Sequence, residues 1–112
     1  MMPKTFSLVN RQWRVRGVTS KQLPRHLETH WADDEELLNT AGNLKGLCDP
    51  DASRIFINKD SHTTQEDMEH TYFHELVHAL LYAEGIDSHG HDEAMVDRIG
   101  GFLHQIERSK KC

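Results

Sequence analysis

The sequence has few of the residues that stabilise very small secreted proteins or membrane proteins. Its two cysteines, Cys48 and Cys112, are too few for a disulfide framework and do not form a C-x-x-C metal pair. The longest uninterrupted apolar stretch is residues 79–83, whereas a membrane-spanning helix needs about 18 apolar residues. The first residues also lack the apolar middle of a signal peptide. We therefore expect one domain, residues 1–112, in the cytoplasm and without a membrane partner.

Acidic residues are scarce at the start of the chain and abundant after it. Residues 1–30 carry six Lys or Arg against one acid, and residues 31–112 carry seven against seventeen, which gives the net charge of -5. Arg11, Arg14 and Arg16 could form a basic patch for nucleic acid, but alternating arginines are more common on an exposed strand face. We therefore expect no nucleic-acid partner, and Cys48 is expected in the core.

Apolar residues alternate with polar ones in the first half of the chain. Residues 6–8 and 13–15 alternate around Asn10 and Arg11, which predicts two strands joined by a turn. Residues 44–48 and 54–58 flank the turn-rich residues 49–53, which predicts a hairpin with Ile55 and Ile57 on one face. Residues 19–40 are ambiguous.

The spacing becomes helical from about Gln65. One predicted helix has acidic residues in its first turn and a capping glycine at Gly85, and its apolar stripe comprises Phe73, Leu76, Val77 and Leu80. A second helix is predicted from Asp92 to about Arg108, with a core stripe of Val96, Ile99, Leu103 and Ile106. Together the elements predict an α+β fold in which a small antiparallel sheet packs on these two helices.

The first predicted helix contains the sequence FHELVHAL, in which Glu75 follows His74 and precedes His78. Two histidines four residues apart lie on one side of a helix and can bind a single tetrahedral zinc ion. A catalytic zinc site usually has three protein ligands, and Glu93 follows His78 after a loop long enough to reverse the chain. Asp97 lies one turn after Glu93, where a carboxylate can accept a hydrogen bond from a ligand histidine.

Two glycines in the second helix have a structural explanation. Gly100 and Gly101 are costly inside a helix, and they are expected to let the two helices approach closely.

The oxyanion-stabilising residue is not identified by the sequence. The candidates by residue type are Tyr72, Tyr82, His89, His91 and His104, and each is more common in a purely structural role.

H-E-x-x-H followed by E-x-x-x-D on the next helix resembles the gluzincin signature of thermolysin-like zinc peptidases. The short form is similar to minigluzincins, to ImmA/IrrE-like peptidases and to small phage-encoded HExxH proteins. The resemblance covers residues 69–106 closely and residues 44–58 more loosely. Thermolysin-like members have Asn before the ligand glutamate, where this chain has Asp92.

This resemblance implies a minimal zincin-like metallopeptidase domain with specific residue roles. His74, His78 and Glu93 would bind Zn²⁺, Glu75 would be the general base, and Asp97 would support a ligand. The strand at residues 54–58 would be the edge strand above the active-site helix, where an extended peptide or protein substrate could add as a further strand.

The implied reaction is hydrolysis of a peptide bond by water that the metal activates and Glu75 deprotonates. One alternative keeps the zinc without the catalysis, in a metal-stabilised binding or regulatory module. Because Glu75 is not a ligand, such a module would not need it. Another alternative is an ordinary polar helix face that binds no metal.

Overall fold

The computed structural model describes residues 2–8, 11–23 and 45–110, so much of the ambiguous segment at residues 19–40 lies outside the described residues. Strands and helices occur in an α+β arrangement, which confirms the predicted class. The elements in chain order are β1 (Thr5–Leu8), β2 (Arg11–Val18), β3 (Gly46–Asp49), β4 (Arg54–Asn58), η2 (Lys59–Ser61), α3 (Gln65–Ala83), η3 (Ser88–Gly90) and α4 (Glu93–Ser109).

The four strands form one sheet in the order β1-β2-β4-β3. β1 pairs with β2 and β3 pairs with β4 in antiparallel fashion, so both predicted strand pairs are confirmed. β2 and β4, however, are parallel, with Val15 opposite Ile55, so the sheet is mixed rather than antiparallel as expected. β4 is bonded on both sides. The prediction that residues 54–58 form the edge strand is therefore wrong, and β3 is the edge strand on that side of the described sheet.

Side chains on the two faces of β4 enter two separate clusters. Ile55 and Ile57 are fully buried in the larger cluster, together with Trp13 and Cys48, while Phe56 joins a smaller one. The shared face predicted for Ile55 and Ile57 is thus confirmed, as is the burial of Cys48. The larger cluster also contains residues of α3, so this face of the sheet carries the helix.

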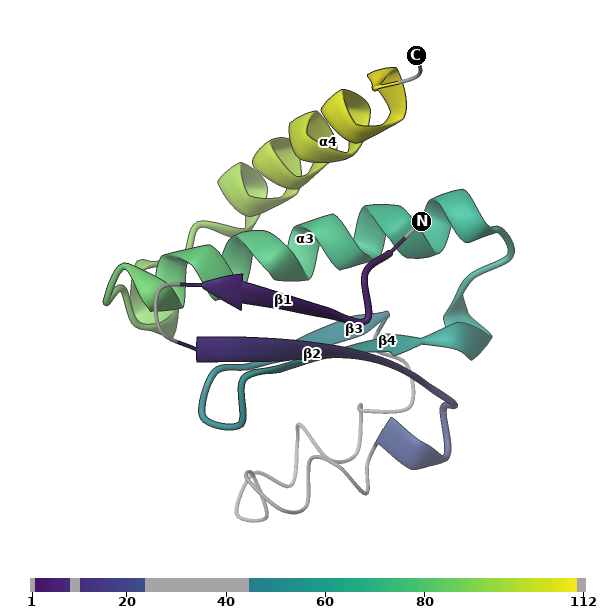
Figure 1. The fold of residues 1–112 in the computed structure, drawn as a ribbon, viewed down its shortest axis with the longest axis horizontal. Coiled ribbons are helices and arrows are strands. Elements are labelled where there is room, and N and C mark those ends of the chain that lie inside the picture. The colour runs from purple at the N-terminus through teal and green to yellow at the C-terminus, as the bar shows by residue number, and fades with distance from the viewer. Residues whose placement is uncertain (1, 9–10, 24–44, 111–112) are drawn as a thin grey trace.

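α3 lies across one face of the sheet, and α4 packs on the side of α3 that is away from the sheet (Figure 1). α3 begins at Gln65 after Thr64, whose side chain accepts a hydrogen bond from the backbone of Asp67. It ends before Gly85, whose φ of 86° is accessible to glycine at little cost, as predicted for a capping residue. α4 begins at Glu93 after Asp92, whose carboxylate accepts bonds from two backbone N–H groups of the first turn.

The buried faces of the helices differ from the predicted stripes. In α3 the residues packed most tightly toward the sheet include Tyr72 and Ala79, whereas Leu80 is 37% exposed. In α4 Val96 is buried as predicted, but Ile106 is 56% exposed. Because α3 contacts both the sheet and α4, its buried surface is wider than one stripe and includes Tyr72 and Ala79; these contacts do not account for the exposure of Leu80 or of Ile106.

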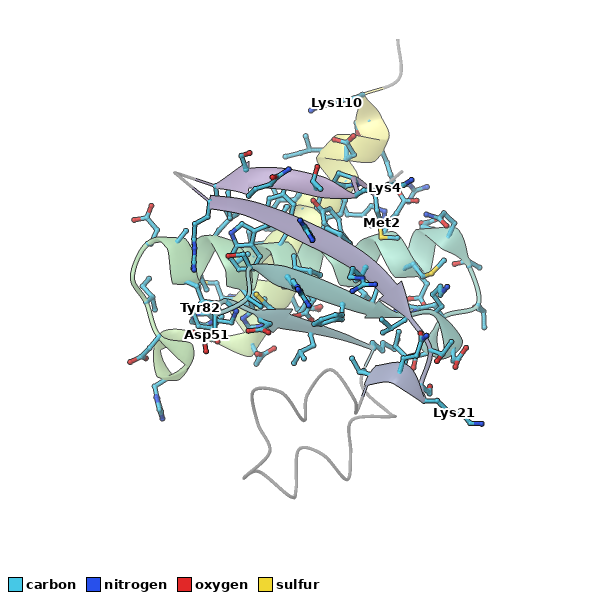
Figure 2. All side chains as sticks on the ribbon, turned by 60° about the horizontal axis from the view of Figure 1, so that its bottom comes forward. Met2, Lys4, Lys21, Asp51, Tyr82 and Lys110 are labelled. Carbon is cyan, nitrogen blue, oxygen red and sulfur yellow. The ribbon has the colours of Figure 1, made fainter. Side chains whose placement is uncertain are left out.

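Side chains of α3 and of the β3–β4 turn meet at one end of the sheet. Tyr82, near the end of α3, lies beside Asp51 of the turn (Figure 2), and both line a hollow of about 510 Å³. The predicted metal ligands, Glu75 and Asp97 are not among the residues that line this hollow, whereas Tyr82, a candidate for oxyanion stabilisation, is. Among the described residues, no helix has both the length and the apolar character needed to cross a bilayer.

Candidate metal centre

Gly100 brings α4 directly against α3 beside the HExxH motif. A Cβ atom at Gly100 would lie 3.0 Å from the backbone N and Cα atoms of His74 and 3.1 Å from the carbonyl carbon of Phe73. Backbone atoms of a helix cannot move aside, so only glycine permits this approach. At Gly101 the nearest atom would be Cε1 of His70 at 3.8 Å. The predicted close approach is therefore confirmed for Gly100 and wrong for Gly101.

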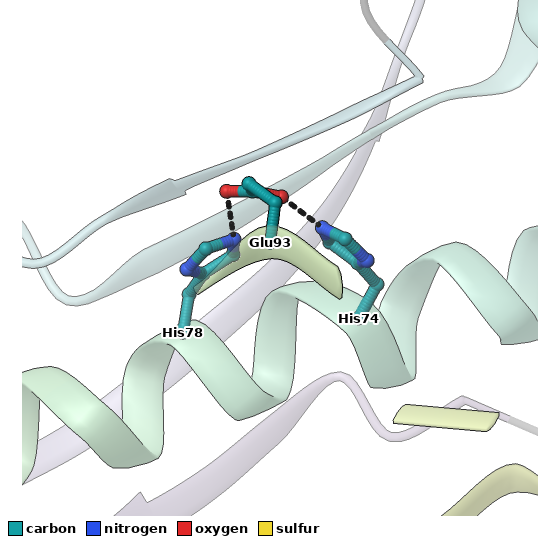
Figure 3. A group of neighbouring side chains, drawn as sticks. All are labelled: His74, His78 and Glu93. Carbon is teal, nitrogen blue, oxygen red and sulfur yellow. Dashed lines mark ion pairs between the residues drawn. The ribbon is translucent and has the colours of Figure 1, made fainter. Parts of the chain in front are cut away.

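The close approach brings His74 and His78 of α3 together with Glu93 from the first turn of α4 (Figure 3). Nε2 of His74 lies 3.2 Å from one carboxylate oxygen of Glu93, and Nε2 of His78 lies 3.1 Å from the other. One potential ligand atom from each residue lies within 4.8 Å of the others. Donors bound to one tetrahedral zinc at roughly 2.0–2.1 Å are about 3.3 Å apart, so this donor set fits a zinc ion.

Burial differs among the three side chains. The side chains of His74 and His78 are 22% and 12% exposed, whereas that of Glu93 is 70% exposed. Burial lowers the pKa of His78, which favours the neutral ring that can bind a metal ion. The cluster is thus anchored on the α3 side and open to solvent at Glu93, which leaves room for water or substrate.

Glu75 points away from solvent, between α3 and the start of β3. It is 8% exposed, and burial, followed by the charge of Glu93, raises its pKa to about 8. A Cβ atom at Gly46 of β3 would lie 3.2 Å from Cγ of Glu75 and 2.7 Å from Cγ2 of Thr71. Glu75 also lines a cavity of about 310 Å³ that includes His74. The carboxyl group of Glu75 is therefore buried, and it borders a cavity that is also lined by His74, one of the potential metal ligands.

Asp97 lies next to His74 on the outer side of the cluster. Its Oδ1 is 3.3 Å from Nδ1 of His74 and 3.4 Å from Nε2 of His70. A carboxylate can only accept, so Nδ1 of His74 donates to Asp97, and Nε2, the atom that faces Glu93, is the one that can bind an ion. The structure thus brings together all five residues that the sequence indicated: His74, Glu75, His78, Glu93 and Asp97.

His91 is a neighbour of the cluster that spacing did not assign to it. Its Nδ1 lies 2.7 Å from Nδ1 of His78, and the two rings are stacked with centroids 5.0 Å apart. Its Nε2 lies 3.0 Å from the carbonyl oxygen of Ile86, and its other side faces Tyr82. Because both ring nitrogens of His91 are engaged, it has no free donor for an oxyanion.

Of the other candidates for oxyanion stabilisation, Tyr82 is half-buried against the ring of His91, and the remaining three are buried elsewhere or exposed. Tyr72 is buried among aromatic residues, and burial raises its pKa to about 12. His104 is buried beside Phe73, and its Nε2 has no hydrogen-bond partner among the described residues. His89 is exposed, and its Nδ1 lies 3.9 Å from a carboxylate oxygen of Asp87.

No protein-family model, curated protein or solved structure matches this chain, so its resemblance to gluzincins depends on the sequence motif and on the site geometry alone.

Proposed function

We propose that this protein is a zinc-dependent peptidase. The observation that carries the proposal is the convergence of the Nε2 atoms of His74 and His78 on the carboxylate of Glu93, at 3.2 and 3.1 Å, beside the buried Glu75. Two imidazoles and one carboxylate are a common ligand set of catalytic zinc in peptidases. We infer that these three residues bind one Zn²⁺ ion.

Glu75 is suited to moving a proton in this reaction. Zinc, when bound, would supply a Lewis acid that polarises the substrate carbonyl and increases the acidity of water. Glu75 would accept the proton of the attacking water and later donate it to the leaving amine. The raised pKa of Glu75, about 8, favours the protonated carboxyl group that must persist between the two steps. A cation bound nearby would favour the ionised carboxylate, which is the form that accepts the proton.

Among the described strands β3 is paired on one side only, so its other edge offers the backbone groups that an extended substrate needs. β4 is unavailable for strand addition because β2 and β3 occupy both of its sides. β3 begins at Gly46, which lies against Glu75, and both residues line the cavity beside His74. A peptide added along the outer edge of β3 would therefore pass next to the proposed general base. We propose an extended peptide segment as the substrate.

The experiment is a peptide-hydrolysis screen of the zinc-loaded protein and of Glu75→Gln. The variant should bind zinc as the parent does, because Glu75 is not among the potential ligands. It should lose hydrolysis, because an amide cannot accept the proton. Equal rates in parent and variant would contradict the role of Glu75, while bound zinc without hydrolysis in the parent would favour the metal-stabilised module.

A further inference from the structure

We propose that His91 is a positioning residue that fixes the ring of His78 and presents its Nε2 atom to the metal ion. This inference rests on the proposed zinc site and adds to it a residue outside the HExxH and E-x-x-x-D pattern. It follows from the two contacts of His91, one with Ile86 and one with His78.

The direction of the hydrogen bonds follows from their chemistry. The carbonyl oxygen of Ile86 has no proton, so Nε2 of His91, 3.0 Å away, must donate to it. In a neutral His91 ring, Nδ1 then has a lone pair and accepts. Its partner at 2.7 Å is Nδ1 of His78, which must therefore carry a proton. Nε2 of His78 is left with the lone pair that a metal ion requires, and it is the atom that faces Glu93.

The end of α3 holds the carbonyl group of Ile86 in place. The backbone N–H groups of Gly85 and Ile86 donate to the carbonyl oxygens of Tyr82 and Leu81, at 2.9 and 3.0 Å. This pattern, with Gly85 at a φ of 86°, is the Schellman motif that fixes the chain after a helix. The acceptor for His91 thus belongs to a defined turn rather than to an unconstrained loop.

Ring contacts hold His91 in the same orientation. Its ring lies at 17° to that of His78, with centroids 5.0 Å apart, and 4.4 Å from the ring of Tyr82. His91 immediately precedes Asp92, whose side chain caps α4. The residue therefore links the end of α3, one potential metal ligand and the start of the helix that supplies Glu93.

The two potential histidine ligands would then have different outer partners. Nδ1 of His74 donates to the carboxylate of Asp97, whereas Nδ1 of His78 donates to a neutral imidazole backed by a backbone carbonyl. Removing such a partner typically weakens metal binding by roughly 10- to 100-fold. We expect a loss of this size when His91 can no longer accept.

The test measures zinc affinity by competition with a chelator in the full chain. His91→Leu, which cannot accept a hydrogen bond, should bind zinc roughly 10- to 100-fold more weakly, and His91→Gln, which has a carbonyl acceptor, should recover most of the affinity. His89→Leu is the matched control, because the side chain of His89 is 95% exposed and its ion-pair partner among the described residues is Asp87. Equal affinities for parent, His91→Leu and His89→Leu would overturn the role of His91.

A nitrogen-detected NMR spectrum of the zinc-loaded parent provides a readout that does not depend on how well a variant folds. His78 should show a protonated Nδ1 and a metal-bound Nε2, and His91 a protonated Nε2 and a bare Nδ1. Zinc bound through Nδ1 of His78, or a proton on Nδ1 of His91, would overturn the inference while leaving the zinc site intact. A parent that binds no zinc would instead refute the proposed function, and the role of His91 with it.

Discussion

Replacing Glu75 by Gln should stabilise the metal-free protein, and the gain should grow with pH. Folding raises the pKa of this carboxyl group from 4.5 to about 8, mainly because the group is buried. Between pH 4.5 and pH 8 the folded protein keeps a proton that the unfolded chain has lost. The unfolding free energy of the parent therefore declines as the pH rises through this interval and levels off above pH 8. The amide of glutamine does not titrate, so the variant should lack this decline.

The size of the effect follows from the two pKa values. Each pKa unit corresponds to about 1.4 kcal/mol, and most of the interval from 4.5 to about 8 lies between pH 5 and pH 8. The difference in unfolding free energy between variant and parent should therefore increase by about 3 kcal/mol over this pH range. Effects of other titrating groups that are shared by the two proteins cancel in this difference.

The assay is urea-induced unfolding of parent and variant in the presence of EDTA at several pH values from 5 to 8. Glu84→Gln is the matched control, because this side chain is exposed just after α3 and should give a pH profile parallel to that of the parent. A difference between Glu75→Gln and the parent that stays constant from pH 5 to pH 8 would refute the reasoning. It would show that the carboxyl group of Glu75 is charged in the folded protein across this range.

Three further predictions concern α4. Gly100→Ala should lower the free energy of unfolding by about 1–3 kcal/mol and weaken zinc binding, because the new methyl group meets backbone atoms of α3. Gly101→Ala should raise the free energy of unfolding by about 0.5–1 kcal/mol, and thermal unfolding distinguishes the two variants. Asp92→Ala should lower stability by about 1 kcal/mol through loss of the helix cap but leave zinc affinity nearly unchanged, and a large loss of zinc would contradict this. Glu93→Ala should abolish tight zinc binding, and Asp97→Ala should weaken it by roughly 10- to 100-fold; the reverse order in a chelator competition would contradict the assigned roles.

The helices that carry the site were predictable because their signals are local. Acidic residues occupy the first turn of α3, Gly85 follows its end, and the four-residue spacing of His74 and His78 places both on one side. The spacing of Glu93 and Asp97 likewise depends only on α4 being helical. Gly100 added one long-range signal, since a glycine inside a helix is costly unless another backbone lies close to it.

The sheet could not be derived in the same way, because strand order is a long-range property. The parallel pairing of β2 with β4 joins segments separated by more than thirty residues, and alternation within each strand does not specify its neighbours. This pairing makes β3 rather than β4 the edge strand, which moves the proposed substrate path. The contact of His91 with His78 also depends on how the chain turns after Gly85, and residue spacing does not encode that turn.

The most direct test of the central claim is the zinc content of the purified protein, measured by elemental analysis after removal of loosely bound metal. The described residues contain one set of three potential ligand atoms within 4.8 Å, and this set predicts about one tightly bound zinc ion per chain. The double variant His74→Ala/His78→Ala, which keeps Glu93 but removes both imidazoles, should contain almost none. A parent protein without zinc after exposure to excess metal, or a double variant that retains it, would contradict the proposed metal centre.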